Sequence, residues 1–227
     1  MRKNLAKTKS SFSIQSFEGG YDKNFSYLIT CLETITTVIV DASLESIRLQ
    51  PFQKSRPKAI LITHSHHDHI RYVNEYMETY PEIKIVGHPS SKLHNIPEIN
   101  FLPMKDNSVY KLGNLDIRTI HTPGHYYDSV CFLVENIIFT GDTLFVGRTG
   151  RTLSGGSNVS DLYQSVYKKL LNLPGDTIIY PGHNYGSRPT ITIRENIINS
   201  NLLQASGEKD FIDRMKNYEK NLSLIHI

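Results

Sequence analysis

The sequence predicts an α/β fold in a single domain, and three observations lead to that prediction. At 227 residues the chain can bury a large single core, and α/β layers of this length often form one unit. Short runs rich in β-branched and aromatic residues recur along the chain, and segments of helical length lie between and after them. We find no repeat of about 20 to 50 residues, which argues against a solenoid or a propeller.

The first part of the chain is expected to be mostly strands. Runs of strand character occupy residues 12–17, 25–32, 36–42, 58–64 and 84–88. Each run is bounded by polar or turn residues, as strands usually are. The segment that begins after Ser65 has helical length and ends near Tyr80, just before Pro81. The sequence therefore predicts a strand, a loop and a helix in succession around residue 64.

A second set of strands follows, and the chain then turns helical. Strands are expected over residues 115–122, 129–135, 136–142 and 176–183, with a helix over 158–173. Two terminal helices are expected over 190–203 and 208–221. In the last of these, apolar side chains at helical spacing are interpreted as packing residues: Phe211, Ile212, Met215 and Tyr218. The final residues, 222–227, fit no element that we can predict.

Composition and charge exclude several classes of protein. The chain is 39% hydrophobic and 21% charged, and it has no apolar run of the length that spans a bilayer. A net charge of +3, with the lysines spread along the chain, gives no reason to expect nucleic acid as a partner. The amino end, residues 1–17, has a basic start but lacks the apolar segment and the small-residue cleavage site of a secretory signal. Cys31 and Cys131 lie in strand-like runs as expected for buried free thiols, so a cytoplasmic location is predicted.

Side chains that can bind a metal are most concentrated in the stretch "THSHHDHI", which places His64, His66, Asp68 and His69 within six positions. Three more groups, His125, Asp142 and His183, each come after a strand-like run and beside a glycine. Any one of these side chains could equally be a satisfied polar group. Taken together, five histidines and two aspartates without a thiolate suit two adjacent divalent ions better than one structural zinc ion.

These motifs resemble those of a known family. The stretches "THSHHDHI", "HTPGH", "FTGDTLFVGRTGR" and "LPGDTIIYPGHNYG" are similar to the metallo-β-lactamase fold superfamily, in the branch of glyoxalase II and persulfide dioxygenases. The resemblance implies a four-layer αββα sandwich, in which two mixed β-sheets are flanked by helices. It also implies a domain over residues 1–205, with residues 206–227 forming a C-terminal helix and tail packed on it.

The resemblance implies a ligand set as well. One metal would be held by His64, His66 and His125, and the other by Asp68, His69 and His183, with Asp142 bridging the two. Two divalent ions are expected, zinc first and iron or manganese as alternatives. Such a pair activates water to attack an ester or thioester carbonyl, with Asp68 and Asp142 as the carboxylates nearest the chemistry. Lactam hydrolysis is disfavoured, because true lactamases of this fold are expected to have a cysteine at the position of Asp142 and no histidine at that of His69.

Residues outside the ligand set are implied too. Asp41, at the end of the strand-like run 36–42, resembles the acidic residue beneath the histidine loop and is expected to fix an imidazole. The alternative interpretation of Asp41 is that it is a turn residue at the end of a strand. The basic residue that binds glutathione in glyoxalase II corresponds to Arg151. The tyrosine that follows the last metal-binding histidine in that family corresponds to Tyr185. These two predict a small anionic thioester as substrate, although Thr152 and Leu153 depart from that family's aromatics.

Two alternatives stay open at this stage. The persulfide dioxygenase branch is similar in "GRT" (150–152), in "LPGD" (173–176) and in "YPGHNY" followed by "TITIRE". There a single iron ion would be held by His64, His125 and Asp142, and the reaction would be an oxygenation. A non-catalytic or nucleic-acid-processing member of the fold is the second alternative; the complete ligand set and the lack of a basic stripe argue against it. The oligomeric state has no signal in the sequence.

The remaining histidines are interpreted as surface or packing residues, because they lack the strand-end glycine of the candidate ligands. They are His67, which fills a variable position of the motif, and His88, His94, His121 and His226.

Overall fold

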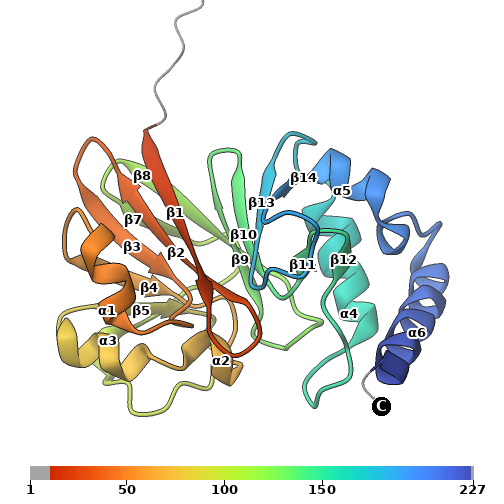
Figure 1. The fold of residues 1–227 in the computed structure, drawn as a ribbon, viewed down its shortest axis with the longest axis horizontal. Coiled ribbons are helices and arrows are strands. Elements are labelled where there is room, and N and C mark those ends of the chain that lie inside the picture. The colour runs from red at the N-terminus through yellow and green to blue at the C-terminus, as the bar shows by residue number, and fades with distance from the viewer. Residues whose placement is uncertain (1–10, 226–227) are drawn as a thin grey trace, which may run out of the picture.

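The computed structural model describes residues 11–225, and these form four layers in the order helices, sheet, sheet, helices (Figure 1). The two sheets have six strands each, and a two-stranded ribbon accompanies the second. The predicted αββα sandwich with two mixed sheets is therefore confirmed. The basic start over residues 1–10 and His226, both interpreted above, lie outside the described residues.

The first sheet has the strand order β1-β2-β3-β4-β5-β6. Its strands are β1 (Phe12–Gly19), β2 (Asn24–Cys31), β3 (Thr36–Val40), β4 (Pro57–Leu61), β5 (Lys84–Gly87) and β6 (Phe101–Pro103). The first three pair antiparallel, and β3 to β6 pair parallel. Every residue of β2 is buried, as expected for a central strand covered on both faces. The five predicted strands of this half are all present; β6 lies in a segment for which we predicted no element.

The second sheet has the order β14-β13-β10-β9-β8-β7. Its strands are β7 (Val109–Leu112), β8 (Leu115–His121), β9 (Val130–Val134), β10 (Ile137–Gly141), β13 (Ile178–Pro181) and β14 (Ile191–Thr192). The pair β10 and β13 is parallel, and the other neighbours are antiparallel. The ribbon consists of β11 (Leu144–Phe145) and β12 (Arg148–Thr149), directly after β10.

The helices that accompany the first sheet are short: α1 (Ser46–Leu49), η1 (Gln50–Phe52), α2 (His67–Ile70), α3 (Val73–Thr79) and η2 (Glu98–Asn100). The prediction of one continuous helix from residue 66 to 80 was wrong, since α2 and α3 are separate. Tyr72, at φ −108° and ψ 13°, leaves the helical region between them. The backbone of Ala42 holds the break, because its N–H donates to His69 and its carbonyl accepts from Tyr72. Docking of α2 on the end of β3 thus overrides the local helical pattern.

The helices of the second half are α4 (Val159–Tyr163), the π-helical segment η3 (Gln164–Leu170), α5 (Ile193–Asn199), η4 (Asn201–Leu203) and α6 (Glu208–Ile225). Thr192 and Glu195 form a capping box at the start of α5, so the predicted helix over 190–203 begins after a short strand. Phe211 and Met215 of α6 are buried against this half, as predicted. The helix continues through Ile225 into the stretch for which we predicted no element.

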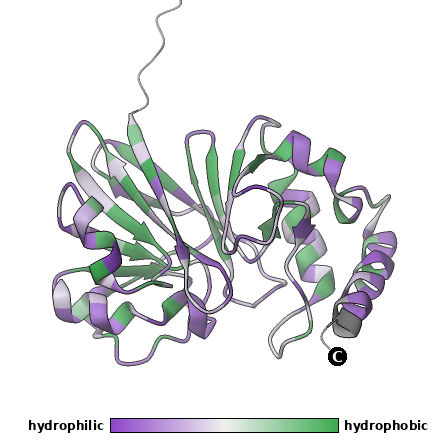
Figure 2. Cartoon of the chain, viewed as in Figure 1, coloured by the Kyte–Doolittle hydropathy of each residue, from purple (hydrophilic) through white to green (hydrophobic). Residues whose placement is uncertain are grey.

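Three apolar clusters join the four layers. The one between the sheets contains Ile29, Val38, Phe132 and Phe139, all fully buried. A second packs the outer face of the first sheet against α1 and α3, and a third packs the second sheet against α4, η3, α5 and α6. Figure 2 shows the matching pattern, with hydrophobic residues along the strands and hydrophilic ones on the outer helical faces. Within the described residues no helix is long and apolar enough to cross a bilayer.

Candidate metal centre

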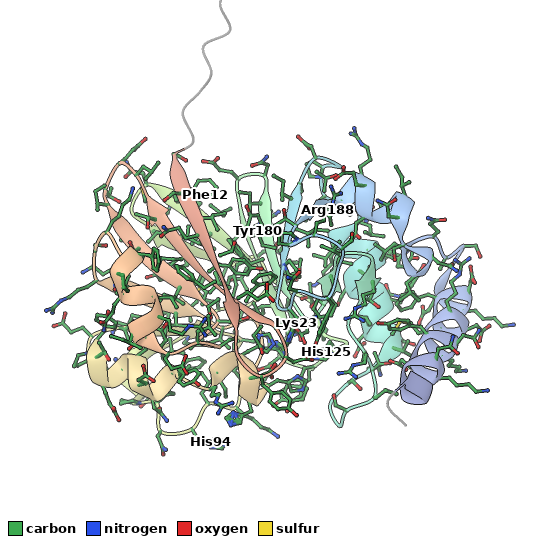
Figure 3. The ribbon with its side chains drawn as sticks, viewed as in Figure 1. Phe12, Lys23, His94, His125, Tyr180 and Arg188 are labelled. Atoms are coloured by element: carbon green, nitrogen blue, oxygen red, sulfur yellow. The ribbon has the colours of Figure 1, made fainter. Side chains whose placement is uncertain are left out.

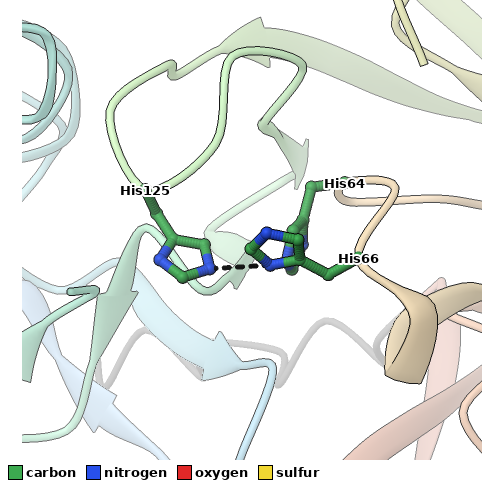
Figure 4. A group of neighbouring side chains, drawn as sticks. All are labelled: His64, His66 and His125. Carbon is green, nitrogen blue, oxygen red and sulfur yellow. Dashed lines mark hydrogen bonds between the residues drawn. The ribbon is translucent and has the colours of Figure 1, made fainter. Parts of the chain in front are cut away.

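Three histidine rings meet at the ends of two strands from different sheets (Figure 4). His64 and His66 follow β4, and His125 lies in the loop between β8 and β9. Nε2 of His64 lies 2.9 Å from Nδ1 of His66, and Nε2 of His125 lies 3.1 Å from the same atom. His64 and His125 are buried, and His66 is partly exposed. The three nitrogens therefore face a common point.

A second cluster lies beside the first. Nε2 of His69, in α2, is 3.2 Å from Nε2 of His183, which follows β13. Oδ2 of Asp68 lies 3.3 Å from the His183 nitrogen and 3.6 Å from the His69 nitrogen. His69 and His183 are buried, whereas Asp68 is one-third exposed. This cluster again joins a loop of the first sheet to a loop of the second.

The carboxylate of Asp142 lies between the two clusters. Its Oδ1 atom is 3.3 Å from Nε2 of His69, and its Oδ2 atom is 3.3 Å from Nε2 of His183 and 3.5 Å from Nε2 of His125. Oδ1 is buried and has no hydrogen-bond partner within the described residues. All seven predicted ligand side chains are thus brought together in the structure, and the two oxygens of Asp142 face donor atoms of both clusters.

The donor set fits divalent cations. Ligand atoms placed about 2.1 Å from a tetrahedral centre lie about 3.4 Å apart, close to the separations in both clusters. Imidazole nitrogens with lone pairs facing one another repel unless a proton or a cation lies between them. Nitrogen and oxygen donors without sulfur are typical of sites for zinc, iron or manganese.

The far side of the His69 ring is held by a buried carboxylate. Nδ1 of His69 lies 2.8 Å from Oδ2 of Asp41, and Asp41 also accepts hydrogen bonds from the backbone N–H and the hydroxyl of Thr63, each at 2.8 Å. Asp41 adopts a φ of 56°, a left-handed conformation that Asp and Asn tolerate better than most residues. Its position under the histidine loop fixes the His69 tautomer with Nε2 free for a ligand.

Backbone carbonyls hold two other rings in the same way. Nδ1 of His125 lies 2.8 Å from the carbonyl oxygen of Arg151, and Nδ1 of His183 lies 2.8 Å from that of Asp22. The amide of Asn24 donates to Oδ2 of Asp68 at 2.8 Å, and Asn24 is fully buried. Sequence analysis did not find Asn24 or Asp22, because no local pattern marks contacts made over 44 and 161 residues of chain.

The protonation equilibria of the cluster are shifted by burial and by charge. Burial lowers the pKa of His66 to about 4 and holds the pKa of His64 well below its ordinary value. Burial opposes a charge on His69 and His183 too, but Asp142 and a second carboxylate outweigh it and raise both pKa values, that of His183 to about 9. Burial disfavours the Asp142 carboxylate, yet His183 and His69 hold its pKa well below its usual range. Asp142 is therefore ionised at any physiological pH.

Gly182 is one of the glycines beside the candidate ligands, and the space around it shows why no larger residue fits there. A Cβ atom at this position would lie 2.4 Å from Oδ1 of Asp142 and 2.8 Å from Cε1 of His69. Any larger residue would push these groups apart. The glycine before His183 therefore lets the end of β13 pack directly against the carboxylate that joins the clusters.

A cavity of about 640 Å³ opens above the clusters. Arg151 and Tyr185, the two predicted substrate-binding residues, both line it, and so does His67 at its exposed edge. The Tyr185 ring stacks on His183 at 4.8 Å between centroids, and its hydroxyl donates to the carboxylate of Asp22. The side chain of Arg151 is exposed, and none of the described residues forms an ion pair with it.

The residues interpreted as structural lie away from the clusters. The rings of His88 and His121 stack on each other at 4.1 Å, and His94 lies at the outer edge of the molecule, whereas His125 lies between its two halves (Figure 3). Cys31 and Cys131 are buried free thiols, as predicted. Burial raises the pKa of the Cys131 thiol to about 12, so it is not a nucleophile.

Comparison with known proteins gives a family match over most of the chain. The family model of the metallo-beta-lactamase superfamily matches residues 19–183. A probable hydroxyacylglutathione hydrolase of Schizosaccharomyces pombe is 35% identical over 176 residues, which cover 73% of this chain and 66% of that protein. A probable polyketide biosynthesis zinc-dependent hydrolase of Bacillus velezensis is 26% identical, over 89% of this chain and 91% of the relative. The chain thus spans just under two thirds of the length of the yeast relative.

Solved structures are similar over nearly all of the chain. ETHE1 from Myxococcus xanthus superposes with a TM-score of 0.79 and 27% identity, covering 91% of both chains. The BLEG-1 B3 metallo-beta-lactamase superposes with a TM-score of 0.72 and 27% identity, over 86% of this chain and all of the other. One fold is thus shared by proteins whose names describe different activities.

Proposed function

This chain belongs to the metallo-beta-lactamase superfamily, and we propose that it is a metal-dependent thioesterase of the hydroxyacylglutathione hydrolase type. The observation that carries the proposal is the position of Asp142, whose two oxygens lie 3.3 Å from the His69 and His183 nitrogens while one of them also lies 3.5 Å from His125. A carboxylate shared by two donor clusters is what a two-metal hydrolase needs. The hydroxyacylglutathione hydrolases among its relatives support the thioester substrate.

The residues divide into two ligand sets in this proposal. His64, His66 and His125 would hold one ion, Asp68, His69 and His183 would hold the other, and Asp142 would be a ligand shared by the two sets. Two bound divalent ions would supply a hydroxide at neutral pH and would stabilise the negative charge that develops on the attacked carbonyl oxygen.

The chain's own residues orient the ligands and the substrate. Asp41 holds the His69 ring with Nε2 toward the centre, and the carbonyl groups of Asp22 and Arg151 do the same for His183 and His125. At the rim, the Arg151 guanidinium has two parallel N–H groups for a substrate carboxylate. Tyr185, stacked on His183, lines the same cavity and would limit where the thioester lies over the clusters.

Metal analysis combined with turnover tests this proposal. Protein purified without added metal is expected to contain about two ions per chain, because the seven donor side chains form two ligand sets. The same protein is expected to hydrolyse a hydroxyacylglutathione thioester, to lose that activity on chelation and to regain it with zinc. Metal-loaded protein that hydrolyses neither this thioester nor a simple acyl thioester would contradict the proposal.

A second candidate is an iron-dependent persulfide dioxygenase, and the likeness to ETHE1 over 91% of both chains favours it. In that case His64, His125 and Asp142 would hold a single iron ion, and the other four side chains of the set would not be ligands. The two functions differ in metal content and in oxygen consumption. One iron ion per chain, with oxygen uptake on glutathione persulfide, would support the dioxygenase, whereas two ions without uptake would support the hydrolase.

A further inference from the structure

A second arginine lines a cavity that adjoins the first and shares Arg151 and Tyr185 with it, and this arginine has no role in the function described so far. Arg148, in β12, places its guanidinium carbon 4.1 Å from the centre of the Tyr185 ring and 5.7 Å from that of Phe145. Its Nη1 atom donates to the Tyr218 hydroxyl at 3.0 Å. Tyr185 in turn stacks on His183. A row of contacts therefore connects this guanidinium to a candidate metal ligand.

Among the described residues no carboxylate lies within ion-pair distance of Arg148 or of Arg151. The Nε atom of Arg148 is buried and has no hydrogen-bond partner there. Both arginines line one cavity of about 620 Å³, with His125 and Asp142 also among its lining residues. Two acids line this cavity: Asp22 accepts the Tyr185 hydroxyl, and Asp142 faces the histidine clusters, so neither is paired with an arginine. Two guanidinium groups without acidic partners in one cavity favour the binding of an anion there.

The C-terminal helix holds this arrangement in place. Tyr218 of α6 lines the cavity and accepts from Arg148. One residue further, the Glu219 carboxylate accepts from the backbone N–H of Thr152 at 2.5 Å and from its hydroxyl at 3.0 Å. These contacts dock α6 on the segment that carries both arginines. A guanidinium stacked on an aromatic ring and tied at one nitrogen is preorganised, so it loses little side-chain entropy on binding an anion.

We propose that Arg148 forms, with Arg151, a two-arginine anion subsite that binds a thiol portion carrying at least two negative charges, and this inference rests on the proposed thioesterase function. A substrate with a single carboxylate would satisfy one guanidinium and leave the other unpaired in the cavity. Glutathione, with two carboxylates, and thiols that carry phosphate groups both meet the requirement. Arg148 thereby selects the leaving thiol and not the acyl group.

Binding of an inert ligand tests the subsite without turnover. The probes are S-methylglutathione, which has no thioester, and inorganic pyrophosphate, titrated calorimetrically into metal-loaded protein. Arg148→Ala is expected to weaken binding of at least one probe about tenfold, as the loss of one charge-assisted hydrogen bond does. The probe that responds distinguishes a carboxylate from a phosphate ligand. Arg118→Ala, on the exposed side of β8 and remote from the cavity, is the matched control and is expected to bind both probes like wild type.

Kinetics then separates binding from scaffolding. Arg148→Ala is expected to raise KM about tenfold for a glutathione thioester, while KM and kcat for the uncharged N-acetylcysteamine thioester of the same acid stay at wild-type values. Tyr218→Phe keeps the cation and removes its tether, so a smaller rise in KM is expected. An equal KM effect on the charged and uncharged thioesters, or a fall in melting temperature with unchanged probe affinity, would show that Arg148 only anchors α6.

The two proposals fail in different ways. If wild type hydrolyses no thioester but binds a probe through Arg148, the thioesterase function is wrong and the subsite stands. If wild type is an active thioesterase and Arg148→Ala matches Arg118→Ala in every measurement, the subsite is wrong and the function stands. Wild-type protein that binds neither probe overturns the subsite regardless of its activity.

Discussion

The carboxylate of Asp41 lies 2.8 Å from Nδ1 of His69, and this contact ties the end of β3 to α2. Both residues are buried, and Asp41 takes a left-handed conformation that directs its side chain beneath the histidine loop. The ring of His69 is therefore fixed before any ligand arrives, with its other nitrogen facing His183 and Asp142.

The first prediction removes the charge from this contact. Asn tolerates the left-handed backbone of Asp41, so Asp41→Asn is expected to fold but to bind metal about 10- to 100-fold more weakly. Metal retained after dialysis against a graded series of chelator concentrations measures the effect. The control is Asp116→Asn, whose carboxylate pairs with Lys111 on the surface. Equal metal retention by the two variants would show that Asp41 does not contribute to metal binding.

The second prediction compares a shared ligand with an exposed neighbour. Asp142→Ala is expected to lower kcat/KM more than about 100-fold, since it removes the carboxylate that faces both clusters. His67→Ala changes only the edge of the cavity and is expected to keep most of the activity. Both are assayed with their metal content determined. A comparable loss of activity in the two variants at equal metal content would show that His67 has a role we did not assign.

The third prediction uses the close approach of Gly182. Gly182→Ala brings a methyl group within 2.4 Å of Oδ1 of Asp142, so it is expected to reduce metal content and activity and to destabilise the fold by about 1–3 kcal/mol. Gly155→Ala, where the added methyl group meets nothing within 4 Å, is the matched control. Chemical denaturation and metal analysis of the two variants give the comparison. Wild-type metal content in Gly182→Ala would mean that the site has more room than the structure gives it.

The fourth prediction concerns Arg151. Arg151→Ala is expected to raise KM for an anionic thioester about tenfold and to leave a small neutral ester nearly unaffected, because the exposed guanidinium at the cavity would contact only the charged portion of the substrate. Circular dichroism and melting curves check that the variant folds. If KM rises equally for both substrates, Arg151 is part of the scaffold, and the proposal of an anionic substrate loses a main support.

The fifth prediction is a pH dependence that metal removal exposes. In metal-free protein burial disfavours the charged His183 ring, but Asp142 and Asp68 raise its pKa to about 9, above the value of about 6.5 in an unfolded chain. A raised histidine pKa adds stability that is full below pH 6.5 and is lost as pH rises through 9. The melting temperature of chelated protein is thus expected to fall over this window. His183→Gln in the same chelated state is expected to show a smaller fall, and an unchanged slope would exclude His183 as the cause.

Much of the fold was predictable, because strand runs such as residues 25–32 and 129–135 combine β-branched residues with clear polar boundaries. The break at Tyr72 was not, since the Ala42 backbone that causes it lies about thirty residues earlier in the chain. Local propensity has no information about such docking. The strand β6 was missed for a similar reason: it has three residues and owes its extended state to pairing with β5.

The candidate ligands were visible in the sequence because seven donor side chains recur at strand ends in known motifs. Their supports were less visible. Asn24 donates to Asp68 from 44 residues away, and nothing around it distinguishes it from a turn asparagine. Tyr218 was interpreted as a packing residue from its helical spacing, and it does pack on the second half. Its hydroxyl also reaches Arg148, a contact across 70 residues that helical periodicity cannot show.

The donor atoms come from both sheets, and this has a thermodynamic consequence. His64, His66, Asp68 and His69 follow β4, whereas His125, Asp142 and His183 follow strands of the second sheet. Neither half of the sandwich contains a complete coordination sphere. Bound ions would therefore cross-link the halves, and the free energy of metal binding would be shared with the packing between the sheets. Any substitution that loosens the apolar cluster between the sheets, to which Phe132 and Val38 belong, is expected to weaken metal affinity although neither residue lines the cavity.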